Sequence, residues 1–216
     1  DIVKYLVENG AEVNAKDKEG NTALHLASKI WIADIVKYLV ENGAQVNARN
    51  EEGNTALHLA SKQFNVRIVK YLVEKGAEVK AKDKHGKTAL HLASDKLYLD
   101  VVKCLVENGA EVNAKDEEGK TALHLASKQF NVNIVKYLVE KGAEVKARDK
   151  EGKTALDLAF TQFNVNIVIC LVENGAEVKA RDKHGKTALH LAIEKWNTLD
   201  VVKCLVENGA EVNAKD

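Results

Sequence analysis

Five histidines recur at a regular spacing, and the chemistry they could support is metal binding or general-base catalysis. His25, His58, His91 and His124 follow one another at intervals of 33 residues, and His190 falls in the same register. Imidazole is a common metal ligand and titrates near neutral pH. The ligands of one zinc ion must lie about 2 Å from it, whereas helices in neighbouring repeats pack roughly 10 Å apart. We therefore interpret the histidines as structural and expect no metal site.

The three cysteines are a second group with chemical potential. Cys104, Cys170 and Cys204 stand at a position that other repeats fill with tyrosine. That exchange is typical of a half-buried packing position and not of a ligand set. A disulfide requires Cα atoms within about 7 Å of each other. Since Cys170 and Cys204 belong to neighbouring repeats, we expect no disulfide.

Other motifs of catalysis are missing from the sequence. It contains no glycine-rich phosphate loop, no nucleophile elbow and no Cys-x-x-Cys pair. The paired carboxylates Glu51–Glu52 and Glu117–Glu118 fall in turns at the hairpin tips, where solvent surrounds them. We therefore expect no enzyme activity and no cofactor.

Composition and charge exclude further classes of protein. The 216 residues include 32 basic and 32 acidic side chains, so the formal net charge is zero. This balance argues against a general attraction to nucleic acid or anionic membranes. An odd number of cysteines disfavours a secreted disulfide framework, no apolar run approaches the roughly 20 residues of a membrane span, and the residues from Asp1 onward are no signal peptide. We expect a monomeric, soluble protein of the cytoplasm with neither a nucleic-acid nor a membrane partner.

The elements that position these residues come from an internal repeat. The motif Thr-Ala-Leu-His-Leu-Ala, with Asp157 replacing one histidine, recurs every 33 residues. A second motif, Leu-Val-Glu-(Asn/Lys)-Gly-Ala, keeps the same interval until its last step, which is 34 residues. The one-residue insertion therefore lies between Ala192 and Val201. The six threonines that open the first motif are Thr22, Thr55, Thr88, Thr121, Thr154 and Thr187.

One repeat shows the expected local structure. Thr88 is a good N-cap for a short helix that starts at Ala89, and Leu90 and Ala93 share one side of it. A second helix starts near Asp100 and ends at Gly109, which supplies a left-handed residue. An extended hairpin loop with an Asp-Glu-Glu-Gly turn then leads to the next threonine. Helices this short must stack on their neighbours to be stable.

The sequence resembles the ankyrin repeat family over essentially its whole length. The resemblance rests on the 33-residue period, the Thr-x-Leu-His-x-Ala signature and the Gly-Ala-Glu-Val-Asn-Ala segment. It implies an all-α, ankyrin-type solenoid of stacked helix-turn-helix units with protruding β-hairpin loops, in which each signature histidine satisfies the cap and loop of its own unit. Residues 1–216 would form a single array with a half repeat at 1–16 and full repeats at 17–49, 50–82, 83–115, 116–148, 149–181 and 182–215.

The sequence departs from the family in the turn between the paired helices. Where the family usually has Gly-His, the glycine position holds Trp31, Phe64, Leu97, Phe130, Phe163 and Trp196. A bulky residue at positive φ is strained. We therefore expect the first helix to run one residue further in four repeats, with Asn65, Asn131, Asn164 and Asn197 taking the left-handed position, which asparagine tolerates.

The resemblance implies a protein-binding surface made of the hairpin tips and the first helices. Charge sign alternates along the tips, so a partner with complementary charge could read the register. The expected contact residues of the hairpin tips are Lys18, Glu19, Glu51, Glu52, Lys84, His85, Lys87, Glu117, Glu118, Lys120, Lys183, His184 and Lys186. Those at the ends of the first helices are Ile30, Trp31, Gln63, Lys96, Gln129 and Trp196.

Two features of this surface have alternative interpretations. The row of Trp and Phe residues either packs between neighbouring turns, which we favour, or anchors an interface; Ile30 and Trp31 are the best candidates for exposed anchors. A basic column runs through Lys16, Arg49 and Lys82 and could track phosphates. Because an Asp or Asn follows each of its members, we interpret it as a solvated ladder.

The sequence therefore favours a non-catalytic scaffold that binds another protein, whose identity does not follow from the residues. One alternative is an engineered or purely architectural array without a natural ligand, although such an array need not vary its tip charges. Another is a targeting segment of a larger effector or enzyme. Neither end resembles the polar capping repeat that a solenoid needs, which favours an excerpt from a longer array.

Overall fold

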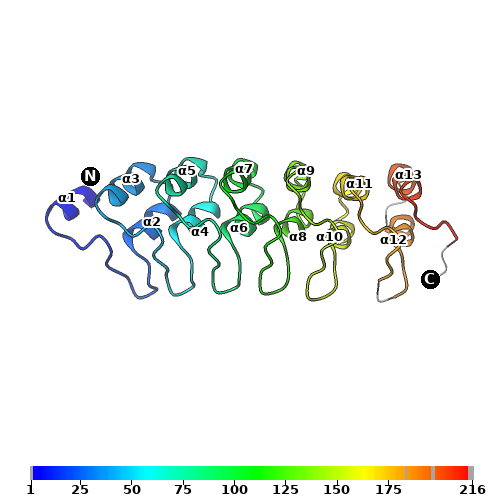
Figure 1. The fold of residues 1–216 in the computed structure, drawn as a ribbon, viewed down its shortest axis with the longest axis horizontal. Coiled ribbons are helices and arrows are strands. Elements are labelled where there is room, and N and C mark those ends of the chain that lie inside the picture. The colour runs from blue at the N-terminus through cyan, green and yellow to red at the C-terminus, as the bar shows by residue number, and fades with distance from the viewer. Residues whose placement is uncertain (1, 183, 196–197, 214–216) are drawn as a thin grey trace. The chain divides into compact units, whose positions relative to one another are not determined.

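The computed structural model describes residues 2–182, 184–195 and 198–213, and thirteen helices lie in this part of the chain (Figure 1). The first helices of the repeats are α2 (Ala23–Lys29), α4 (Ala56–Ser61), α6 (Ala89–Asp95), α8 (Ala122–Ser127), α10 (Ala155–Thr161) and α12 (Ala188–Lys195). The second helices are α1 (Ile2–Glu8), α3 (Ala33–Glu41), α5 (Val66–Glu74), α7 (Leu99–Glu107), α9 (Val132–Glu140), α11 (Val165–Glu173) and α13 (Leu199–Glu207). The fold class expected from the repeat is confirmed.

The chain divides into two compact units, residues 1–117 and 118–216. In the first unit α2 packs on α4 and α4 on α6, while α3 packs on α5 and α5 on α7. In the second unit α8, α10 and α12 form one such row and α9, α11 and α13 the other. The hairpin loops project from the helix rows (Figure 1). They are built mainly of turns, and the described residues contain one isolated antiparallel bridge, between Arg181 and Thr187.

The core comes from the same motif positions in every repeat. The first leucine of the signature is almost fully buried, as Leu57 and Leu90 show with 1% of their surface exposed. Ala93 is fully buried beside Leu90, so the predicted buried side of this helix is confirmed. From the second helices come pairs such as Val69 and Leu72, both fully buried. Each helix pair thus buries its apolar side against the next pair, which short helices need in order to persist.

The signature histidine joins two repeats, which differs from the expectation that it serves its own repeat alone. The Nδ1 of His58 accepts a hydrogen bond from the Thr55 N–H (3.2 Å), within the predicted N-cap. Its Nε2 lies 3.1 Å from the carbonyl oxygen of Lys87, 29 residues further on. Since Nδ1 accepts, the proton is on Nε2, which donates to that carbonyl. His25 makes the same contact with the carbonyl oxygen of Asn54 (3.0 Å).

The prediction for the turn between the paired helices is wrong. Asn65, Asn131 and Asn164 have negative φ values, and of the bulky residues before them Phe163 is left-handed, with a φ of 58°. In the two repeats outside the prediction, Trp31 and Leu97 have φ values of 69° and 67°. The helices α4 and α8 end at Ser61 and Ser127, whereas α10 runs one residue further, to Thr161, and Asn197 lies outside the described residues.

The reason for this difference is the start of the second helix. The Oδ1 of Asn65 accepts the Ile68 N–H (3.1 Å), and the Oδ1 of Asn164 accepts the Ile167 N–H (3.2 Å). An N-cap needs a non-helical residue whose side chain accepts such a bond. The asparagines are therefore used as caps. Of the bulky residues before them, Phe163 takes the left-handed conformation that the asparagine was expected to take.

The histidine bridge can be tested with a substitution that the chain already contains. Asp157 occupies the histidine position of one repeat and keeps the cap, since its Oδ2 accepts the Thr154 N–H (2.8 Å). We expect His58→Asp to retain the cap but lose the bond to the Lys87 carbonyl, lowering the free energy of unfolding by about 1 kcal/mol. Chemical denaturation checks this value, and an unchanged stability would contradict the bridge.

The same residue predicts a pH dependence. Burial lowers the pKa of His58 because it disfavours the charged ring. The unfolded chain therefore binds more protons than the folded chain below the unfolded histidine pKa of about 6.5, and stability falls as pH falls through that value. We expect a smaller decline between neutral and mildly acidic pH in His58→Asp than in the wild type, measured by the same denaturation. Equal declines would show that His58 is not linked to folding.

Candidate functional site

The hairpin tips form a connected row in which each tip is hydrogen bonded to the next. In the first unit the Glu51 N–H donates to the Glu19 carbonyl, the Lys84 N–H to that of Glu52, and the Glu117 N–H to that of His85, each at 3.0 Å. In the second unit the Lys150 N–H donates to the Glu118 carbonyl (2.9 Å). Side chains that the sequence places at these tips therefore stand on a fixed main chain.

An aspartate or asparagine at the base closes each loop. The Oδ1 of Asp17 accepts the N–H groups of Glu19 (3.0 Å) and Asn21 (2.7 Å), and Asn50 and Asp83 do the same in the next two loops. Partial desolvation acts to raise the pKa of Asp17, but these donors hold it below its usual value. A carboxylate that remains ionised keeps the loop closed at neutral pH.

The basic column also belongs to this framework. The Lys16 Nζ donates to the Arg49 carbonyl (3.0 Å), Arg49 to that of Lys82 (2.6 Å), and the Lys82 Nζ to that of Lys115 (2.8 Å). Each cation thus reaches the backbone of the following repeat. These bonds support the interpretation of the column as a solvated ladder.

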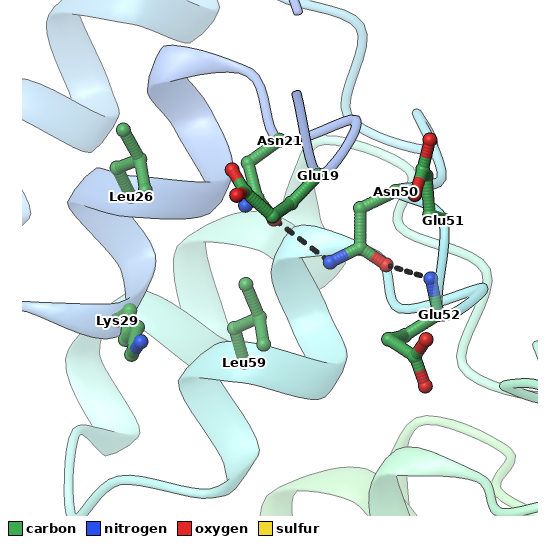
Figure 2. A pocket seen from close by; sticks show the side chains of 8 residues that line it. All are labelled: Glu19, Asn21, Leu26, Lys29, Asn50, Glu51, Glu52 and Leu59. Carbon is green, nitrogen blue, oxygen red and sulfur yellow. Dashed lines mark hydrogen bonds between the residues drawn. The ribbon is translucent and has the colours of Figure 1, made fainter. Parts of the chain in front are cut away.

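A groove opens between two hairpin tips and the first helices of the first unit (Figure 2). Leu26 from α2 and Leu59 from α4 form its apolar floor, and 46% of the Leu26 surface is exposed. The tips contribute the exposed carboxylates of Glu19, Glu51 and Glu52. The space enclosed is about 260 Å³. The groove therefore combines an apolar floor with an acidic wall.

The groove wall is held by two asparagines, and its far end carries a cation. The Asn50 Nδ2 donates to the Asn21 Oδ1 (2.8 Å), and the Asn50 Oδ1 accepts the Glu52 N–H (3.1 Å) (Figure 2). Lys29 lies at the opposite end from the tips (Figure 2). The sequence-based prediction missed Leu26, Leu59 and both asparagines. Leu26 and Leu59 hold the second leucine of the signature, and that position alone could not have revealed them, because Leu92 and Leu125 at the same position are buried with 8% exposed.

The carboxylates of the groove differ in whether they already form an ion pair. Glu52 lies 3.6 Å from the Lys84 ammonium and 3.9 Å from His85 Nε2. Glu19 and Glu51 make no ion pair with any described residue. These two carboxylates are the ones that a cationic group in the groove would meet without displacing a partner.

The residues at the ends of the first helices do not pack as we favoured. Ile30, Trp31 and Phe64 expose 60%, 56% and 59% of their surfaces, so the packed interpretation is wrong for these three residues, while Leu97 and Tyr98 are half-buried; that the row anchors an interface stays a prediction. The Trp31 Nε1 donates to the Gln63 Oε1 (3.2 Å), and the Phe64 and Tyr98 rings lie 5.4 Å apart between centroids. A turn leaves these side chains no neighbouring helix to cover them, which explains the exposure.

The remaining predicted contact residues are dispersed. In the first unit Lys18 and Lys96 are exposed and Lys87 is half-buried. In the second unit Gln129 is half-buried and His184 is exposed. Two lysines of the second unit form ion pairs, Lys120 with Glu118 and Lys186 with Glu194 (2.6 Å). Lys183 and Trp196 lie outside the described residues. Of the predicted set, the groove brings together only Glu19, Glu51 and Glu52.

The groups considered for chemistry are structural in their setting. Cys104, Cys170 and Cys204 are free thiols and are buried, more deeply than the half-buried position expected. Burial raises the pKa of all three thiols, so they are not activated nucleophiles. Among the described residues, no three His, Cys, Asp or Glu side chains are placed to share a metal ion. No helix in the same part of the chain is long and apolar enough to cross a membrane.

Stacked helix pairs, linked hairpin tips and the bridging histidine agree with one family model. The model described as "Ankyrin repeats (3 copies)" matches overlapping segments at residues 1–83, 33–116, 76–149, 98–182 and 145–216. The chain belongs to the ankyrin repeat family. Ankyrin repeats generally act as protein–protein interaction modules and are typically non-catalytic. No curated protein matches the chain.

The linked tips of this ankyrin array predict an unequal effect of two glycine substitutions. Gly53 has a φ of 72°, and a Cβ there would lie 3.0 Å from the Lys84 main-chain nitrogen. Gly43 has a φ of 86° but no atom within 4 Å of such a Cβ. Both positions favour glycine because of their left-handed backbone. We expect Gly43→Ala to cost about 1 kcal/mol of unfolding free energy and Gly53→Ala clearly more. Equal losses in chemical denaturation would contradict the close approach of the tips.

Proposed function

We propose that the array is a non-catalytic module that binds a partner protein through the groove and the hairpin tips of its first unit. The observation that carries the proposal is the apolar floor of Leu26 and Leu59 beside the carboxylates of Glu19 and Glu51. Burying exposed leucine surface favours association, and carboxylates at a rim select the charge of what approaches. The fixed main chain of the tips supports this role, because little ordering is needed on binding.

The chemistry of the groove favours a partner segment that presents arginine or lysine. Such a side chain has an aliphatic stem that can cover the two leucines and a cationic head that can reach Glu19 and Glu51. Lys29 at the other end suits an acidic side chain or carbonyl of the same segment. The tip of the next repeat, with Lys84 and His85, reverses the charge and sets the register of a longer partner.

The compartment proposed is the cytoplasm. Three buried cysteines without a disulfide suit a reducing environment. The proposal does not depend on the second unit, whose hairpin tips carry their own intramolecular ion pairs, such as Lys153 with Glu151 (2.7 Å).

The test is selection of random peptides on the immobilised array, followed by measurement of the affinity of the selected peptides. We expect enrichment of arginine and lysine beside an apolar residue. The variant Glu19→Lys/Glu51→Lys should weaken the selected peptides by tenfold or more, since losing one ion pair and gaining a repulsion costs about 1.4 kcal/mol or above. Fluorescence anisotropy gives the affinities.

The matched control is Glu117→Lys/Glu118→Lys, which makes the same charge change at another hairpin tip. It should leave the affinities of these peptides unchanged. Selected peptides without cationic enrichment, or equal weakening by both variants, would contradict the groove as the binding site. An array that selects no peptide would favour a purely architectural role.

A further inference from the structure

We propose that the first unit carries a second docking surface, which takes an acidic amphipathic α-helix of a partner protein. The surface is the aromatic row, defined as Ile30, Trp31, Phe64 and Tyr98, at the turns between the paired helices. These four residues do not line the groove between the hairpin tips, although Lys29, which borders the first of the turns, does. The proposal rests on the four residues of the row and not on the proposed function of that groove.

One residue of the aromatic row, Trp31, is exposed at a conformational cost. Trp31 has a φ of 69° and yet keeps 56% of its surface in contact with solvent. A bulky residue is disfavoured in the left-handed region, where glycine is tolerated. Burial inside the chain does not offset this cost, because the side chain is not buried. Contact with another molecule would offset it, and strained, exposed side chains are typical of binding sites.

Side-chain contacts join the row into a strip. The Trp31 indole N–H donates to the Gln63 side chain at 3.2 Å, which brings it beside the turn that holds Phe64. The Phe64 ring meets the Tyr98 ring at a centroid distance of 5.4 Å and an angle of 51°. The row thus crosses three successive turns, with a polar link between the first two and a ring contact between the last two. Exposed apolar side chains gathered in this way mark an interaction surface.

The spacing of the strip fits an α-helix. Helices of adjacent repeats, such as α2 and α4, pack about 8–10 Å apart, so the turns repeat at that distance. Two turns of an α-helix advance about 10.5 Å and return to the same face. A helix with one apolar residue per heptad therefore places one contact on each turn of the strip. An extended segment advances about 10 Å in three residues, and successive contacts would then point to opposite sides.

The charge beside the strip selects an acidic helix. Each row residue is preceded in its turn by a lysine, namely Lys29, Lys62 and Lys96. Lys29 and Lys62 make no ion pair with any described residue, whereas Arg67 is paired with Asp34 at 3.8 Å. Asp95 beside Lys96 makes the third turn less positive, so the first two turns dominate. A second copy of the chain would bring the same lysines face to face, which disfavours self-association.

The test uses a helical peptide of three heptads with leucine at the first position of each heptad, glutamate at the flanking positions and alanine elsewhere. A second peptide replaces each glutamate by lysine, and a third has the residues of the first in scrambled order. Binding to the full chain is followed by fluorescence anisotropy. We expect the glutamate peptide to bind at least about tenfold more tightly than the other two.

Variants identify the surface. Trp31→Ser/Phe64→Ser should weaken the glutamate peptide by at least about tenfold, whereas Phe130→Ser, which removes an exposed aromatic side chain from the second unit, should not. Both substituted side chains of the first variant are exposed, and its thermal unfolding checks that it stays folded. Lys62→Glu should weaken the preference for the glutamate peptide over the lysine peptide, which a merely structural role of this lysine would not do; Lys29 is left unchanged because it also lines the groove.

The remaining outcomes separate this proposal from others. Glu19→Lys/Glu51→Lys should leave the glutamate peptide bound, so that failure at the groove and failure at the row are distinguishable. Equal binding of the glutamate and scrambled peptides, or an unchanged preference after charge reversal, would overturn the proposal. So would a concentration-dependent dimer in sedimentation velocity that Trp31→Ser abolishes, because the row would then be a contact between copies.

Discussion

The hydrogen bond from the signature histidine to the following repeat is the interaction on which the arrangement depends. Each helix pair is too short to persist alone, so its neighbours must hold it in place. In His58 one ring closes the N-cap of its own helix and donates to the Lys87 carbonyl at the base of the next hairpin loop. A helix start and a neighbouring loop are therefore fixed by a single side chain, and His25 and His124 make the same contact with the following repeat.

The main-chain hydrogen bonds between neighbouring hairpin tips allow the tips to differ in charge without altering the fold. The main-chain bonds between tips, such as Glu51 to Glu19, use no side-chain atoms. These bonds do not constrain the charged side chains at the tips. Acidic, basic and mixed pairs of residues can therefore follow one another from tip to tip. The groove arises where two acidic tips stand next to the exposed Leu26 and the half-buried Leu59 of the first helices. Binding chemistry is in this way separated from stability.

The parts of the fold that follow the repeat period could be predicted from the sequence. The prediction failed where two local requirements compete for one residue. The helix starts at the threonines, the buried leucines and the left-handed glycines after the second helices all follow from motif positions. The turn before Asn65 did not follow, because asparagine suits both a left-handed position and an N-cap, and sequence alone does not rank the two. In the structure Asn65 serves as the N-cap, because the Ile68 N–H donates to its side chain. For the candidate site, the charged tips were predictable, whereas the leucine floor was not, since exposure depends on how far the hairpin stands from the helix.

The same turn explains why the apolar surface lies where it does. In the first of these turns Ile32 stands at the N-cap without a side-chain bond, and Trp31 before it takes a left-handed backbone with a φ of 69°. A glycine would adopt that conformation at the least cost, so a tryptophan there is a departure from local consistency. Such departures concentrate at functional sites. The indole of Trp31 is neither buried nor needed for the cap, so it adds apolar area to the surface and not to the core. The role of this turn therefore differs from that of the stacked helices.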